Sequence, residues 1–107
     1  GEKAAIEAIR PGRKMSEIFK IGQETIRKSG VSGFTRYNLG HGVGLNAHEP
    51  PIVSPENDQF IQEGMVFTIE TPYYMYGFGG FNSEDIVLAT SGGCELLSTI
   101  DREMRIL

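Results

Sequence analysis

The spacing of apolar residues changes near residue 33 and divides the chain into two parts. Before this point, apolar residues recur every three or four positions, which predicts helices over residues 2–10 and 16–29. The residues that share a helix face are Ala5, Ile6 and Ile9 in the first helix and Ile18, Phe19, Gly22, Thr25 and Ile26 in the second. Ser16 is the expected N-cap of the second helix, and Gly30 is its expected C′ residue.

After residue 33, short runs of β-forming residues alternate with turns, which predicts strands. The expected strands cover residues 33–39, 65–71, 81–90 and 94–97, and the expected loops or connections cover residues 52–64 and 72–80. From residue 101 onward we expect an edge strand or a frayed end. Two helices followed by a mostly antiparallel, curved sheet form an α+β fold. The chain contains no repeat or linker, so residues 1–107 are interpreted as a single segment.

Composition narrows the class of protein. The 107 residues are enough for one domain, and the net charge of −4 comes from interspersed acids and bases. We therefore expect no nucleic-acid partner, which would need a basic patch, and no membrane partner. The single cysteine, Cys94, excludes an internal disulfide, and no apolar run reaches the ~20 residues of a membrane span. A cytoplasmic location is expected. The start at Gly1 without methionine is interpreted as the sign of a longer parent protein or a shortened chain.

Candidate chemistry is concentrated in residues 39–51, which hold the only two histidines, His41 and His48. Three glycines surround His41, and two prolines close the segment. Glycine lets the backbone approach a ligand closely, and histidine acts as a neutral metal ligand or as a proton carrier near neutral pH. This composition is more typical of a binding site than of a packed core.

Two glutamates, Glu70 and Glu84, lie in segments predicted as strands. A carboxylate on a buried strand face is costly unless it is paired or bound to a metal. Two carboxylates and an imidazole suit Mn²⁺, Fe²⁺, Co²⁺ or Zn²⁺. The residues thus allow a metal site formed by His41, Glu70 and Glu84.

Simpler interpretations stay open for each of these residues. A histidine in a glycine-rich turn is often a structural hydrogen-bonding group, and a glutamate in a strand usually faces solvent or forms a salt bridge. Asp85 and Glu49 are interpreted as solvated or supporting groups. The tyrosines interpreted as a packed cluster or a pocket rim are Tyr73, Tyr74 and Tyr76.

Three ordered motifs resemble those of the pita-bread metallopeptidases, a family that includes methionine aminopeptidases, Xaa-Pro aminopeptidases and prolidases. The motifs are Gly-His-Gly-Val-Gly-Leu-Asn-Ala-His-Glu-Pro-Pro at 40–51, Glu-Gly-Met-Val-Phe-Thr-Ile-Glu at 63–70 and Asn-Ser-Glu-Asp-Ile-Val-Leu at 82–88. Residues 92–97 also resemble the closing hairpin of that family. The resemblance therefore extends over nearly the whole chain.

The resemblance implies a role for each candidate residue. His41 is similar to a histidine ligand of a dinuclear metal site, and Glu84 to the carboxylate that bridges both metals. Glu70 is similar to a ligand that is also the general base. His48 resembles a histidine that binds the scissile amide and its tetrahedral intermediate without binding metal. The implied reaction is hydrolysis of an N-terminal peptide bond by water activated between two divalent cations, Mn²⁺ or Co²⁺ first, with Zn²⁺ or Fe²⁺ as alternatives.

The chain departs from the family pattern in its aspartates. The family uses five ligands, and two of them are aspartates in the preceding half of the fold. Asp58, Asp85 and Asp101 all follow His41, so none matches these ligands. The chain is therefore interpreted as the C-terminal half of a catalytic domain, with an incomplete metal site and without peptidase activity when alone. The missing N-terminal half is an expected partner, and the apolar face that it would cover predicts homo-oligomers.

Substrate class depends on two further positions. Tyr37 stands where prolidase-like members usually carry another histidine, and Asn82 stands where they tend to carry an arginine. Both are assigned as substrate-binding residues, although they depart from the proline-specific pattern. We favour the Xaa-Pro dipeptidase and aminopeptidase branch. Alternatives are a methionine aminopeptidase, a creatinase-like amide hydrolase or a non-catalytic binding module.

One more alternative ignores the resemblance and treats the chain as an independent iron-binding domain. In that interpretation His41, His48 and Glu70 form a two-histidine, one-carboxylate iron site. The geometry separates the two interpretations. A peptidase site requires His41, Glu70 and Glu84 to converge, whereas the iron site requires both imidazoles to point at one ion and leaves Glu84 outside.

Overall fold

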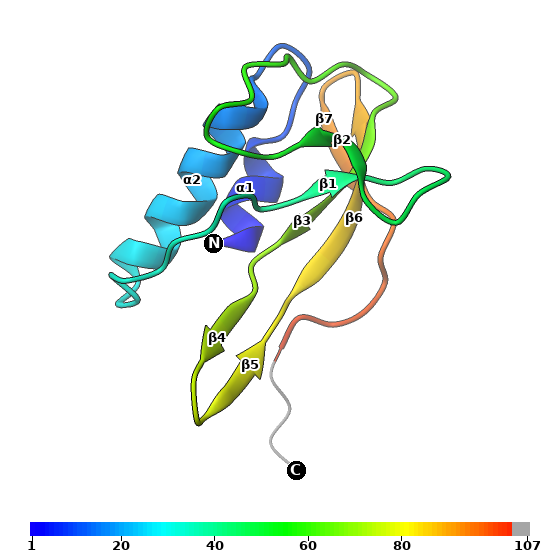
Figure 1. Cartoon of the computed structure of the whole chain (residues 1–107). Coiled ribbons are helices and arrows are strands. Elements are labelled where there is room, and N and C mark those ends of the chain that lie inside the picture. Colours follow the sequence, from blue (N-terminus) through cyan, green and yellow to red (C-terminus); the bar gives the residue numbers. More distant parts are fainter. Residues whose placement is uncertain (104–107) are drawn as a thin grey trace.

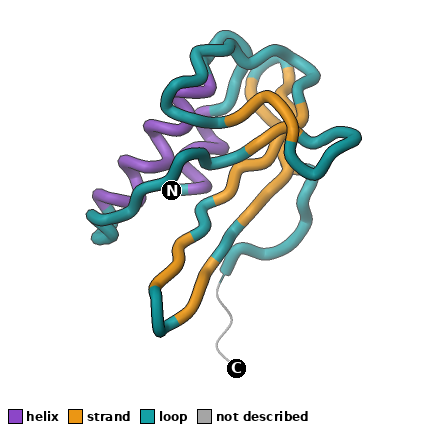
Figure 2. Tube along the Cα trace, in the orientation of Figure 1, coloured by secondary structure: helices purple, strands orange, loops and turns teal. Residues whose placement is uncertain are grey.

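The computed structural model describes residues 1–103. It contains two helices that lie on one side of a five-stranded sheet, and a two-stranded hairpin that extends from the sheet (Figure 1). The elements in chain order are α1 Glu2–Ala8, α2 Met15–Lys28, β1 His41–Gly42, β2 Glu49–Ile52, β3 Val66–Glu70, β4 Tyr73–Met75, β5 Gly79–Phe81, β6 Glu84–Thr90 and β7 Gly93–Leu96. Figure 2 shows that long loops link the short strands β1, β2 and β3. Among the described residues, no helix combines the length and apolarity needed to cross a membrane.

The two predicted helices are present, and their apolar stripes form much of the core. Ala5, Ile6 and Ile9 are buried, as are Ile18, Phe19 and Gly22, whereas Thr25 and Ile26 are half-buried. These side chains pack with buried residues of the sheet, namely Phe67, Ile69, Val87 and Ala89. Burial of such apolar surface is the main favourable term in folding.

The start of α2 differs from the prediction. Ser16 is not the N-cap, because the helix begins at Met15 and the cap is Lys14. The Glu17 carboxylate accepts the backbone N–H of Lys14 at 3.2 Å, while the Ser16 hydroxyl donates to Asp58 at 2.8 Å. At the other end, Gly30 follows the cap Ser29 with a φ of +111°, which confirms the predicted C′ glycine.

The sheet is antiparallel, with the strand order β2-β1-β3-β6-β7. The strand predicted at 65–71 and the closing hairpin after residue 91 are confirmed. In the β3–β6 ladder, Phe67 pairs with Val87 and faces the helices, whereas Glu70 pairs with Glu84. Because strand side chains alternate between faces, Glu70 and Glu84 lie on the face away from the helices.

Two segments fold differently from the prediction. Residues 33–39 form an irregular segment and not a strand. The Phe34 carbonyl oxygen in this segment accepts a hydrogen bond from Nε of Arg27 at 2.7 Å, and the Leu39 N–H donates one to the Val53 carbonyl oxygen at 2.8 Å. Residues 72–80, expected to be a connection, contain β4 and the start of β5, because their tyrosines favour a strand. Accordingly, β6 begins at Glu84 and not at residue 81.

The exposed face of this hairpin is aromatic. Tyr76 is fully exposed, so the tyrosines do not form one packed cluster. Tyr73 alone packs against the core. The large apolar side chains of the hairpin that remain exposed are Tyr74, Met75, Tyr76, Phe78 and Phe81. At the C-terminus, residues 101–103 form no strand, and the rest of the expected edge strand lies outside the described residues.

Gly40 positions the first histidine beside the central strand. A Cβ atom at this position would lie 1.9 Å from the carbonyl oxygen of Thr68 in β3, so no other residue fits without moving the backbone. Its neighbour His41 donates its backbone N–H to the Thr68 hydroxyl at 3.2 Å. The close approach of Gly40 therefore fixes the distance between β1 and β3.

We predict that Gly40→Ala lowers the free energy of unfolding by about 2 kcal/mol, because the methyl group forces β1 away from β3. Urea denaturation measures this change. Gly33→Ala is the matched control, since a Cβ there meets no atom within 4 Å. Equal stability of the two variants would contradict the close-approach argument.

Candidate functional site

Three of the candidate residues lie on neighbouring strands of the sheet, and a fourth, His48, lies beside His41. His41 comes from β1, Glu70 from the end of β3 and Glu84 from the start of β6. The Nε2 atom of His41 lies 3.8 Å from Oε1 of Glu84, and the rings of His41 and His48 have centroids 4.1 Å apart. Residues separated by up to 43 positions in the sequence, from His41 to Glu84, thus lie side by side.

The hydrogen bond of the His41 ring determines which nitrogen faces the site. Nδ1 lies 3.1 Å from the carbonyl oxygen of Gly42, and a carbonyl oxygen can only accept. Nδ1 therefore carries the hydrogen, and in the neutral ring Nε2 presents its lone pair to the Glu84 carboxylate. Two electron-rich atoms that face each other at 3.8 Å form a pair of donors to which a cation could bind. A carbonyl partner of this kind is the usual way in which a metal-binding histidine is oriented.

The two glutamates add negative charge at the same place. Glu70 and Glu84 are direct partners across the antiparallel ladder. Directly opposed residues on one face have Cβ atoms about 5 Å apart, and like charges in that arrangement destabilise a sheet. Glu70 is half-buried, and the Glu84 side chain is 40% exposed, so both carboxylates can reach solvent. A bound cation would relieve this repulsion.

The donor set fits a divalent transition metal. One imidazole nitrogen and carboxylate oxygens suit Mn²⁺, Fe²⁺, Co²⁺ or Zn²⁺. Metal–ligand distances of about 2.1 Å on each side would accommodate one ion between atoms that are 3.8 Å apart. Among residues 1–103, however, no group of three or more His, Cys, Asp or Glu side chains is close enough to hold an ion.

His48 lies in an exposed loop, residues 43–48, that follows β1. Glu49 supports this loop. Its carboxylate accepts the Asn46 N–H at 3.2 Å, and it lies so close to Gly44 that a Cβ there would be 1.9 Å from Oε1. Glu49 is half-buried, which agrees with the predicted supporting role.

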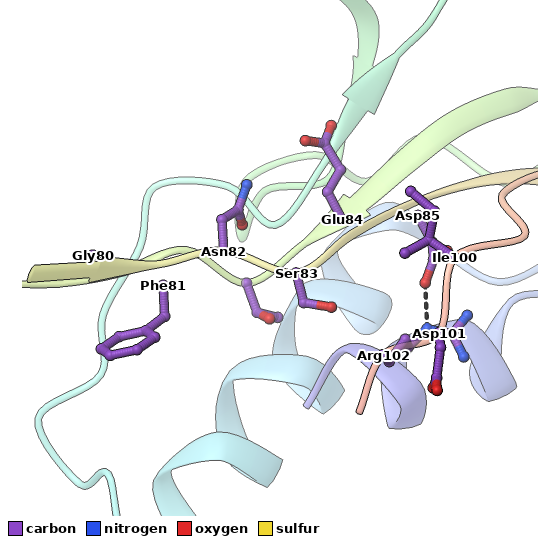
Figure 3. A pocket seen from close by; sticks show the side chains of 10 residues that line it. Gly80, Phe81, Asn82, Ser83, Glu84, Asp85, Ile100, Asp101 and Arg102 are labelled. Atoms are coloured by element: carbon purple, nitrogen blue, oxygen red, sulfur yellow. Dashed lines mark hydrogen bonds and ion pairs between the residues drawn. The ribbon is translucent and has the colours of Figure 1, made fainter. Parts of the chain in front are cut away.

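The two residues assigned to substrate binding lie in different places. Tyr37 is 93% exposed, on the irregular segment before β1. Asn82 lies two residues before Glu84, and both line a cavity of about 750 Å³. Figure 3 shows the Asn82 and Glu84 side chains on one side of the strand and the Asp85 carboxylate on the other, facing Arg102.

Asp85 was expected to be solvated or supporting, and the solvated interpretation is wrong. Its side chain is 3% exposed and accepts a hydrogen bond from Nε of Arg102. Beside it, Glu2 is 6% exposed and accepts the Ser83 hydroxyl. Strand alternation with Glu84 could have placed Asp85 on the inner face, whereas nothing in the sequence signals the burial of Glu2.

Burial raises the pKa of Glu2 above its ordinary value of 4.5. The Ser83 hydrogen bond opposes this change, and the neighbouring Asp85 adds to it. The folded protein therefore holds the Glu2 proton more tightly than the unfolded chain does. It follows that the contribution of Glu2 to stability is fully present below pH 4.5 and is lost as the pH rises through the raised folded-state pKa.

We predict that Glu2→Gln makes the protein more stable than wild type at pH 7 and that this advantage shrinks toward pH 4, because glutamine avoids the cost of a buried charge. Urea denaturation between pH 4 and pH 7 measures it. Glu7→Gln, on the exposed face of the same helix, is the control. A stability difference that does not vary with pH would contradict the burial argument.

Comparison with known proteins gives consistent results. The model of metallopeptidase family M24 matches residues 1–91. An Xaa-Pro dipeptidase of Pyrococcus furiosus is 40% identical over 103 residues, which cover 96% of this chain and 30% of that protein. The chain thus spans less than a third of this relative.

Two solved structures have the same fold. A prolidase from Pyrococcus furiosus has a TM-score of 0.88 at 40% identity and covers 94% of this chain and 30% of its own. A dipeptidase from Pyrococcus horikoshii has a TM-score of 0.92 at 34% identity, with coverages of 99% and 30%. The predicted α+β, pita-bread fold is confirmed by these superpositions.

Proposed function

Because this chain belongs to metallopeptidase family M24, we propose that it forms the C-terminal half of a catalytic domain. In this proposal the complete domain hydrolyses an N-terminal peptide bond of Xaa-Pro substrates, as a dipeptidase or aminopeptidase. The observation that carries the proposal is the pairing of the His41 Nε2 lone pair with the Glu84 carboxylate at 3.8 Å. The iron-site alternative leaves Glu84 aside and does not explain this pairing.

His41, Glu70 and Glu84 are the proposed metal ligands of this chain. Two divalent cations, Mn²⁺ or Co²⁺, would acidify a water molecule and polarise the substrate carbonyl. Other parts of the chain orient these ligands and bring them close together. The Gly42 carbonyl orients His41, and the β3–β6 register brings the two carboxylates together. Two aspartates from the missing N-terminal half would complete the site.

Glu70 and His48 are the proposed catalytic residues. Glu70 ends β3 and can receive a proton at its half-buried carboxylate while it remains next to Glu84. His48 lies in the exposed loop beside His41, where its ring can donate a hydrogen bond to a substrate oxygen as negative charge develops. The proposal thus gives the two adjacent histidines different tasks.

The Xaa-Pro branch is supported by the relatives, whose names include Xaa-Pro dipeptidase and prolidase. Tyr37 and Asn82 are the proposed substrate contacts that adjust substrate preference. Asn82 would contact the substrate in the cavity that it lines together with Glu84. A cytoplasmic location of the complete protein is also part of the proposal, and fractionation of cells tests it.

We predict that the 107-residue chain alone does not hydrolyse an Xaa-Pro dipeptide with added Mn²⁺ or Co²⁺, because it lacks two ligands. The complete catalytic domain is expected to hydrolyse it. Release of free proline measures both reactions. In the complete domain, Glu84→Gln should abolish turnover, while Glu63→Gln, on an exposed loop, should not. Robust turnover by the isolated chain would refute the half-site proposal.

Homo-oligomers of the isolated chain are proposed because the β4–β5 hairpin exposes large apolar side chains. We predict concentration-dependent dimers in light scattering, and a shift toward monomer in the double variant Tyr76→Ser, Phe78→Ser. Tyr37→Ser is the control, since Tyr37 is 93% exposed but lies outside the hairpin. A monomer at every concentration would exclude association through this surface.

A further inference from the structure

We propose that a cluster of polar side chains on the inner side and at the outer edge of β6, with Glu2 and Asp85 buried at its centre, positions the metal-ligating Glu84. The cluster, which we call the β6 clamp, consists of Glu2, Ser83, Asp85, Ser98 and Arg102. Ser83, Asp85 and Arg102 line the same cavity as Glu84, but Asp85 and Arg102 meet on the other side of β6 from the Glu84 carboxylate (Figure 3), so the cluster is assigned a positioning role and not a catalytic one. The inference rests on the proposed function, in which Glu84 is a metal ligand.

The first part of the clamp holds β6 from the face opposite the site. Ser83 and Asp85 flank Glu84 in sequence, and strand alternation turns them to the inner face. The Ser83 hydroxyl donates to Glu2 of α1, and the Asp85 carboxylate accepts from Arg102 of the C-terminal segment. The residues on both sides of Glu84 are thus anchored to different parts of the protein.

The second part of the clamp holds the outer edge of β6. Strand β7 pairs with β6 from Val87 to Thr90 and goes no further toward Glu84. Beyond this ladder, Leu97 N–H donates to Ile86 O at 2.8 Å, and the Ser98 hydroxyl accepts the Ile86 N–H at 2.8 Å. Arg102 then contacts Asp85, so the segment 97–102 follows β6 almost to Glu84.

Packing alone does not explain this cluster. It buries two carboxylates, Glu2 and Asp85, below one strand, and Oε1 of Glu2 is buried without a hydrogen-bond partner. Buried charges and unpaired polar atoms weaken a fold, and apolar residues would fill the same space at lower cost. A site, in contrast, requires its ligands to stay within about 0.5 Å of the working geometry. The clamp serves this requirement by bonding both sequence neighbours of Glu84, whose own side chain is 40% exposed.

The first test needs no metal and uses the 107-residue chain. The nuclear Overhauser effect between His41 Hε1 and the Glu84 Hγ protons reports whether the two side chains face each other. We expect this signal in the wild type and a loss of at least half its intensity in Arg102→Met. Arg10→Met is the matched control, because Arg10 is exposed and lines a different cavity, with Gly93 and Cys94 of β7 and without Glu84. Ser98→Ala tests the edge contact independently.

The second test measures Mn²⁺ affinity of the complete catalytic domain by electron paramagnetic resonance. Partners that support a ligand typically change metal affinity 10- to 100-fold, so we expect about tenfold weaker binding in Arg102→Met. Arg102→Lys should recover part of the loss, since lysine can still pair with Asp85. Glu2→Gln, which keeps an oxygen that accepts the Ser83 hydroxyl, should bind Mn²⁺ as the wild type does. Melting temperatures of all variants separate a general loss of stability from a local effect.

The outcomes distinguish this inference from the proposed function. An unchanged His41–Glu84 signal in both Arg102→Met and Ser98→Ala overturns the clamp, whatever the metal affinity. The same loss of Mn²⁺ affinity in Arg10→Met and Arg102→Met also overturns it. If the complete wild-type domain binds no Mn²⁺, the proposed function fails, and the metal-free signal still decides whether the clamp exists.

Discussion

The antiparallel register between β3 and β6 is the constraint on which the site depends. It pairs Phe67 with Val87 toward the helices and therefore pairs Glu70 with Glu84 on the opposite face. A shift of one residue would exchange the two faces and bury both carboxylates in the core. The apolar core thus fixes the register, and the register in turn brings two like charges together. Like charges directly opposite each other destabilise a sheet, and a bound cation would offset this cost.

The histidines depend on a different constraint, the close approach of backbone segments. Gly40 packs against the Thr68 carbonyl, and the backbone N–H of His41 donates a hydrogen bond to the Thr68 hydroxyl. The Gly42 carbonyl then orients the ring toward Glu84. Glycines on both sides of His41 therefore have a physical reason. A larger residue at 40 would separate β1 from β3, and a Cβ at Gly42 would lie 2.2 Å from the carbonyl oxygen of Pro50 in β2.

The sequence predicted those parts that follow from periodicity. The helix stripes, the strand at 65–71 and the closing hairpin each have enough regular positions to be recognised. Prediction from the sequence failed where tertiary contacts override the local preference of residues for a helix or a strand. Residues 33–39 resemble a strand, yet their backbone bonds to α2 and to Val53. Glu2, at the first turn of an amphipathic helix, gave no sign of its burial beneath β6. The convergence of His41 with Glu84 could be expected only from the family resemblance, because neither spacing nor composition relates two residues on non-adjacent strands.

The central claim is that His41 and Glu84 bind the same metal ion and that His48 does not. A crystal structure of the complete catalytic domain with Mn²⁺, with the ion located by its anomalous scattering, tests this most directly. We predict an ion within about 2.2 Å of His41 Nε2 and of a Glu84 carboxylate oxygen, with Glu70 as a further ligand. The His48 ring nitrogens are expected to lie outside bonding distance of the ion. An ion held by both imidazoles without Glu84 would contradict the account.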